Sequence, residues 1–192
     1  MLSVPQPELV TPGEGDIHDQ VARALADEAA ERSRLFEELG LQLTPQRIFD
    51  DFAEDLGRGS GFLYAFVNLI SPDGQHFAGL YQPPPGAGYP VMDRGMRLDH
   101  GWCPHVVHRR RSLPLHNVHA APQFSGNPVV DAAGITSYYG APLIHESGTC
   151  LGTVCIADPE PRQLSDSLKL RDQVAAQRDT VMRAITTGAH RR

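Results

Sequence analysis

The sequence predicts an α+β fold with a central antiparallel sheet of five or six strands. Two pairs of short apolar segments carry this prediction, because the two members of each pair are separated by residues typical of hairpin turns. Asp73-Gly74 separates the first pair, and Glu146-Ser147-Gly148 separates the second. Segments with helical spacing of apolar residues lie at both ends of the chain. Strands that arrive mostly by hairpins, between terminal helices, are typical of an antiparallel sheet with helices packed on it.

The N-terminal region is expected to form a tail and one helix. Residues 1–15 contain several prolines and glycines and few apolar residues, which predicts a flexible tail. Residues 16–43 are expected to hold an amphipathic helix, because apolar residues recur at about helical spacing until Gly40 stops the pattern.

Residues 44–187 are expected to form one globular domain that includes the C-terminal helix. The first helix of this domain is predicted to start at Thr44-Pro45, where a capping residue precedes a proline. Its apolar face is followed by Gly57 and Gly59, which are predicted to end it.

The strands and shorter helices that follow are assigned from the same kinds of signal. Phe62–Ile70 is apolar at both alternating positions except Asn68, which indicates a central strand covered on both sides. Gln75–Tyr81 is its hairpin partner, and the prolines and glycines of residues 83–88 form a loop at a sheet edge. The remaining elements are a short helix at 102–111, a strand at 113–117, a helix at 124–133, the closing hairpin of 138–144 and 151–157, and a final helix from Ser165 to Ile185.

The composition excludes several classes of protein. With 192 residues, of which 41% are hydrophobic, the chain has the size of one globular domain with flanking helices. The net charge of -6 argues against a nucleic-acid surface, because such a surface needs clustered lysine and arginine. No apolar run approaches the ~18–20 residues of a membrane span, so a cytoplasmic protein with no membrane partner is predicted. Three cysteines without CxxC spacing are expected to be reduced thiols.

Two blocks of the sequence resemble bacterial GAF domains, which occur alone or attached to signalling enzymes. The C-terminal block reads YYGAPL, then LGTVCIAD, then PRQLS, and the upstream block reads GWCPHVVHRRRSLPLHNVHAAPQFSGNPVV. The resemblance covers about residues 44–185. It implies a GAF-like fold with the N- and C-terminal helices on one face of the sheet and a ligand cavity on the other. It also implies a non-catalytic sensory or regulatory module for a small molecule, whose identity the motifs leave open.

The terminal helices of GAF domains commonly pair with those of a second subunit. In this chain both helices have apolar faces larger than one small sheet needs to cover, so a homodimer through Asp16–Leu39 and Ser165–Ile185 is expected. No kinase, cyclase or DNA-binding segment accompanies these helices, and the output is therefore expected to reach a separate downstream signalling protein.

The expected ligand cavity is walled by aromatic residues of the strands and by the segment around Cys103. Tyr138 and Tyr139 are adjacent on one strand, so one side chain can face the cavity while the other packs under the helices. Cys103, near the start of a short helix, is the thiol best placed for a lowered pKa. No catalytic residue, metal ligand or cofactor is assigned. The candidate ligand-binding residues are Tyr64, Phe66, Phe77, Trp102, Cys103, His105, Tyr138 and Tyr139.

The sequence leaves two alternative functions open. Histidines and Cys103 are dense between residues 100 and 119, and Cys103-Pro104 followed by His105 resembles short haem-regulatory motifs, so a haem- or metal-binding sensor is one alternative. A thiol redox enzyme is the other, because one GAF-type family reduces free methionine sulfoxide with cysteines of its cavity. That chemistry would need Cys103 and a resolving thiol from Cys150 or Cys155.

Overall fold

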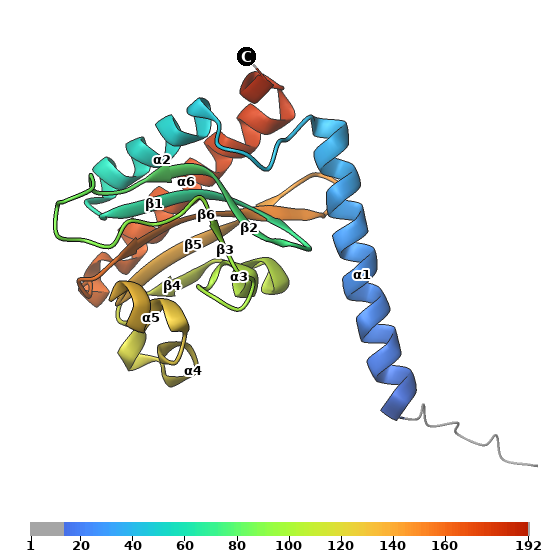
Figure 1. Ribbon diagram of the computed structural model, residues 1–192, viewed down its shortest axis with the longest axis horizontal. Coiled ribbons are helices and arrows are strands. Elements are labelled where there is room, and N and C mark those ends of the chain that lie inside the picture. The colour runs from blue at the N-terminus through green and yellow to red at the C-terminus, as the bar shows by residue number, and fades with distance from the viewer. Residues whose placement is uncertain (1–13, 192) are drawn as a thin grey trace, which may run out of the picture.

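A six-stranded antiparallel sheet forms the centre of the structure, a computed structural model that describes residues 14–191 and the side chains from residue 27 onward (Figure 1). The strands follow the order β3-β2-β1-β6-β5-β4, and each neighbouring pair is antiparallel. This arrangement confirms the predicted fold class. The strands are β1 (Tyr64–Ser71), β2 (Gly74–Tyr81), β3 (Gly95–Met96), β4 (Leu113–Leu115), β5 (Ser137–Ile144) and β6 (Cys150–Asp158).

Helices cover the two faces of this sheet in different ways (Figure 1). Two long helices, α2 (Arg47–Ser60) and α6 (Ser167–Thr186), pack on one face. The other face is covered by three short helices and by the loops around them. These short helices are α3 (Cys103–Arg109), α4 (Pro122–Ser125) and α5 (Pro128–Ala133).

The α1 helix (Glu14–Leu39) lies beside the sheet, at the ends of the two long hairpins (Figure 1). Its C-terminal turns belong to the fold, because Leu35 and Phe36 are buried in the core under α2 and α6. Arg32 Nε also donates a hydrogen bond of 2.6 Å to the Cys150 carbonyl oxygen. Of the tail predicted for residues 1–15, residues 1–13 lie outside the described residues, and the last two already belong to α1. Between residues 14 and 191, none of the helices is long and apolar enough to cross a membrane.

Side chains of the central strands alternate between the two faces, which produces two separate hydrophobic cores. Val67, Tyr139 and Ile156 lie in the core under α2 and α6. Tyr138 and Cys155 lie in the opposite core, together with residues of α3 and α5. The second core is the one that contains the candidate site.

Both predicted boundaries of α2 are wrong. The helix starts after Thr44-Pro45, because the N–H of Gln46 donates a 2.9 Å hydrogen bond to a β2 carbonyl and holds that residue extended. Gly57 does not end the helix but lies inside it, and so does Gly59. A Cβ at Gly57 would fall 2.2 Å from a ring carbon of Tyr81, so this glycine allows α2 to approach β2 closely.

Two other predicted helices also differ from the structure. Ser165 does not start the last helix, because it lies in a short 3-10 helix, η2 (Leu164–Asp166). The α6 helix begins directly after η2, at Ser167. The helix predicted at 124–133 is divided into α4 and α5. Asn127 separates the two, and its side chain accepts a hydrogen bond from the Val129 N–H to cap α5.

Candidate functional site

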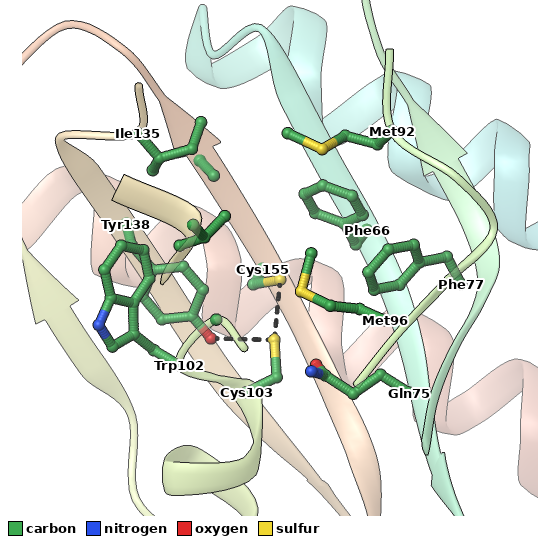
Figure 2. A pocket seen from close by; sticks show the side chains of 13 residues that line it. Phe66, Gln75, Phe77, Met92, Met96, Trp102, Cys103, Ile135, Tyr138 and Cys155 are labelled. Carbon is green, nitrogen blue, oxygen red and sulfur yellow. Dashed lines mark hydrogen bonds between the residues drawn. The ribbon is translucent and has the colours of Figure 1, made fainter. Parts of the chain in front are cut away.

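A cavity of about 40 Å³ lies on the sheet face opposite α2 and α6. The walls come from β1, β2, β5 and β6, from the start of α3, and from the loop that leads into β3 (Figure 2). Most of the wall is aromatic, aliphatic or sulfur-containing. The lining residues are Phe66, Gln75, Phe77, Met92, Met96, Gly101, Trp102, Cys103, Val129, Ile135, Tyr138, Cys155 and Ala157.

Trp102 separates this cavity from an open groove on the surface. Its indole lines both spaces, packs against Tyr138 with ring centroids 5.2 Å apart, and donates a 3.3 Å hydrogen bond from Nε1 to the Phe124 carbonyl oxygen. Gly101, with φ of 68°, adopts the left-handed conformation that turns the chain into α3 at this point. Trp102 is therefore part of the wall between the cavity and the surface groove.

The loop between β2 and β3 covers the cavity from the opposite side, and polar contacts hold it in place. The Gln82 side chain pairs with the backbone of Met92, at 2.7 Å through Oε1 and 3.2 Å through Nε2. Arg94 forms an ion pair of 2.6 Å with Asp50 of α2. These contacts place the Met92 side chain against the rings of β1 and β2, as Figure 2 shows.

The polar end of the cavity is formed by two thiols and a phenol. Cys103 Sγ lies 3.5 Å from Cys155 Sγ and 3.3 Å from the Tyr138 hydroxyl oxygen (Figure 2). Gln75 adjoins this group, but its Nε2 already donates to the carbonyl oxygens of Arg97 and His100. The side chains of these lining residues are all nearly inaccessible to solvent.

Buried amide and hydroxyl groups lie behind the thiols. Asn68 and Thr153 are cross-strand partners on β1 and β6, and both side chains are completely buried. Asn68 Nδ2 donates a 2.9 Å hydrogen bond to Gln75 Oε1. Asn68 Oδ1 and Thr153 Oγ1 have no hydrogen-bond partner among the described residues. These two atoms are therefore available to an additional polar group.

This environment separates the pKa values of the two thiols. The hydrogen-bond contact with Cys155, followed by the influence of the nearby Thr153, Tyr138 and Asn68 side chains, lowers the pKa of Cys103 to about 6 against the opposing effect of burial. Burial raises the pKa of Cys155 and that of Tyr138 well above their ordinary values. Cys103 is therefore the group of this cluster that ionises first, beside a thiol and a phenol whose pKa values are raised.

Five of the eight candidate ligand-binding residues line the cavity. They come from four different segments of the chain, and the cavity lies where the sheet brings these segments together. They are Phe66, Phe77, Trp102, Cys103 and Tyr138.

The other three candidates lie elsewhere. Tyr64 stacks on Phe66 in the same core, but its hydroxyl donates to the Pro90 carbonyl oxygen and its ring is not part of the cavity wall. His105 lies on the outer side of α3, in the surface groove, and packs edge-on against Phe124. Tyr139 is on the opposite sheet face, because adjacent strand residues alternate, and its hydroxyl pairs with Ser167 at 2.9 Å.

Sequence reasoning missed several wall residues. Met92, Met96 and Ile135 lie outside the long strands, where no periodicity indicates which way a side chain faces. Gln75 and Cys155 are strand residues. Side chains two positions apart on a strand share a face, so the spacing of Gln75 from Phe77 could have placed it on the cavity face.

The geometry gives little support to the haem or metal alternative. Within the described part of the chain, no group of three His, Cys, Asp or Glu side chains is placed to hold a metal ion. The cavity volume of about 40 Å³ is also far below the roughly 300–1,000 Å³ of pockets that enclose drug-sized ligands. A porphyrin does not fit inside it.

Comparisons with known proteins agree with this architecture. A model of the GAF domain matches residues 44–178 of the chain, and a search of the curated proteins found no match. The fold is similar to that of a free methionine-R-sulfoxide reductase from Neisseria meningitidis, with a TM-score of 0.54 and 14% identity over 82% of this chain and 89% of that chain.

Two further solved structures are similar in fold. One is the GAF domain of an Acinetobacter phosphoenolpyruvate-protein phosphotransferase, at 14% identity and a TM-score of 0.52 over 84% of this chain and 97% of that chain. The other is the PixJ GAF domain of Thermosynechococcus elongatus in its blue-light absorbing form, at 10% identity and a TM-score of 0.52 over 84% and 91%. At these identities the likeness concerns the fold alone.

Proposed function

The chain belongs to the GAF domain family of ligand-binding sensory modules, and on this basis we propose that it senses a small, uncharged, largely apolar molecule. The observation that carries the proposal is the cavity beside Cys103, on the face of the sheet opposite α2 and α6. The guest occupies this cavity with its apolar part against Phe66 and Phe77. Its polar atom, where it has one, lies at the end formed by Cys103 and Tyr138.

The composition of the wall supports an uncharged guest. Among the described residues, none of the side chains that line the cavity is an aspartate, glutamate, lysine, arginine or histidine. A charged group that leaves water without a partner loses far more free energy than a neutral one. A carboxylate would in addition be repelled by Cys103 when this thiol ionises, which its lowered pKa favours. The wall therefore selects against amino acids and phosphorylated metabolites.

The same argument bears on the alternative of a thiol redox enzyme. The contact between Cys103 and Cys155 favours that alternative, because both sulfurs line the cavity. Free methionine sulfoxide, however, carries a carboxylate as well as an ammonium, and the cavity offers the carboxylate no cationic partner of the kind that burial demands. The interpretation as a sensor is therefore better supported than the interpretation as a thiol redox enzyme.

Output is proposed to pass through a homodimer to a separate signalling protein in the cytoplasm. The predicted interface on α6 has less support than the one on α1, because Leu170, Val174, Val181 and Ile185 pack in the core of the same chain. The N-terminal half of α1 instead extends beyond the sheet (Figure 1). We expect light scattering at micromolar concentration to give twice the mass of one chain, and a monomeric mass would contradict the dimer.

Guest binding can be tested through the methionine methyl groups by NMR. Met92 and Met96 line the cavity, whereas Met182 packs against the opposite core and is an internal control. Xenon and 1-propanol are expected to shift the methyl signals of Met92 and Met96 and to leave that of Met182 in place.

Free methionine sulfoxide at the same concentration is expected to shift none of the three signals and to be left unreduced by a dithiol. Turnover of this compound that is lost in Cys103→Ser would establish the enzyme alternative instead. If xenon and 1-propanol shifted the Met182 signal as much as those of Met92 and Met96, the cavity would not be the site of binding.

A further inference from the structure

Two of the three cysteines lie in contact at the cavity. We propose that Cys103 and Cys155 form an oxidation site, at which a small hydroperoxide that enters the cavity converts the two thiols into one disulfide. The two sulfurs are 3.5 Å apart although 52 positions separate the residues in the chain, and both line the cavity (Figure 2). This inference does not depend on the identity of the guest.

The separation of the two sulfurs is short enough for a disulfide to form by a local movement. A disulfide bond is about 2.05 Å long, so the sulfurs need to approach by about 1.5 Å, which rotation about the Cα–Cβ bonds can supply. Cys103 is the first residue of α3, a helix of only seven residues that can adjust its position more easily than the central strand β6. Cys150, the third cysteine, instead contacts the Gly152 carbonyl oxygen.

The cavity restricts which oxidants reach the sulfurs. Cys103 is 5% exposed and Cys155 is 2% exposed, so large reagents have no direct access from the surface. The cavity volume of about 40 Å³ exceeds the ~10–15 Å³ that one water requires. Hydrogen peroxide, with two heavy atoms, therefore fits beside the thiols, whereas cumene hydroperoxide carries a phenyl ring and does not.

The reaction balances with hydrogen peroxide as the oxidant. The Cys103 thiolate attacks one peroxide oxygen, the O–O bond breaks, and the leaving hydroxide takes up the proton that Cys103 lost on ionisation and becomes water. Cys155 sulfur then attacks the Cys103 sulfenic acid, the S–S bond forms, and the departing hydroxide takes the Cys155 proton. In total, two thiols are oxidised by two electrons and one hydrogen peroxide is reduced to two waters.

The disulfide would change the polar end of the site. It replaces a thiolate and a thiol donor by two weakly polar sulfurs, and it ties the start of α3 to the middle of β6. Trp102 directly precedes Cys103 and is the only tryptophan of the chain, so its fluorescence reports on this event. Oxidation would thereby alter the wall that separates the cavity from the surface groove.

The experiment is to treat the full chain with hydrogen peroxide under denaturant-free conditions and to map its thiols by mass spectrometry. We expect the mass of two hydrogens to be lost, a peptide pair linked through Cys103 and Cys155, and one remaining alkylatable thiol at Cys150. The Trp102 fluorescence should change with the same rate constant. Cumene hydroperoxide should oxidise the two thiols at least about tenfold more slowly than hydrogen peroxide, because the rate depends on access of the oxidant to the sulfurs.

The Cys150→Ser variant is the matched control, because Cys150 is equally buried and burial raises its pKa to about 11. This variant should form the disulfide at the rate of the unmodified protein. Cys155→Ser should instead stop at a sulfenic acid on Cys103, which adds the mass of one oxygen to the intact chain. The rate of disulfide formation should rise with pH as Cys103 ionises. It should level off below the ordinary thiol pKa of about 8.5, because the pKa of Cys103 is lowered.

A disulfide that involves Cys150, a disulfide between two chains, or oxidation of Cys103 to sulfinic acid without any Cys103–Cys155 link would overturn the inference. These outcomes are read in the unmodified protein, so they do not require that the variants fold. Guest binding is measured separately, with reduced protein and the methionine signals, and its failure would leave the oxidation result standing.

Discussion

Gly152→Ala is expected to destabilise the fold by more than about 3 kcal/mol, one of the largest effects of a single substitution in this protein. A Cβ at position 152 would lie 1.9 Å from the carbonyl oxygen of Asn68 and 2.9 Å from the Cα of Leu69. Both atoms belong to the backbone of β1, which is paired with β6 at the centre of the sheet. Neither strand can move away without breaking its other ladder, so the clash cannot be relieved locally.

The free energy of unfolding, measured with urea, checks this expectation. Gly59→Ala is the matched control, because Gly59 is an exposed residue of α2 with no atom near the position of the added Cβ. Alanine is the better helix former, so this control should gain about 0.5–1 kcal/mol. Equal stability of the two alanine variants would show that β1 and β6 do not approach each other as closely as described.

Ile135→Ala is expected to enlarge the cavity and to make room for a ring-sized guest. Ile135 is 1% exposed and forms part of the cavity wall, so its truncation should cost about 2–5 kcal/mol. An apolar cavity of that kind stays dry and takes up benzene. Benzene should therefore restore part of the lost stability, in proportion to RT ln(1 + [L]/Kd), and shift the methyl signals of Met92 and Met96.

Ile185→Ala provides the comparison that separates cavity binding from general repair of a weakened core. Ile185 is also 1% exposed, but it lies on α6 in the opposite core. This variant should lose a similar free energy of unfolding, and benzene should leave Met92 and Met96 unchanged in it. If benzene shifted these two signals equally in both variants, the assignment of the binding site to the cavity beside Cys103 would be wrong.

Local patterns were sufficient to predict the hairpins and the terminal helices. The turn between β1 and β2 consists of Pro72 and Asp73, one position before the predicted Asp73-Gly74, and apolar runs of strand length lie on both sides of it. Helix ends were harder to predict, because their positions depend on contacts with the sheet. Gln46 is held extended by a carbonyl of β2, and Gly57 lies inside α2 where a side chain would clash with Tyr81. Neither partner is near in the sequence.

The candidate site, too, was predicted only in part from local patterns. The period of two along a strand predicts that Tyr138 and Tyr139 face opposite sides, but it does not say which of them faces the cavity. That choice depends on which face α6 covers, and α6 covers the face of Tyr139. His105 was expected at the cavity from its closeness to Cys103 in the sequence. The seven-residue helix α3 turns its side chain outward, into the surface groove.

The amino-acid sequence by itself determined the family, the antiparallel layer and the aromatic character of the site, because turn residues, strand periodicity and motif wording are all local properties of the chain. Only the tertiary structure decided that Cys103 meets Cys155 and that Met92 and Ile135 close the cavity. These contacts join segments far apart in the chain, and they depend on the register of β6 against β1 and on the path of irregular loops, neither of which a local pattern encodes.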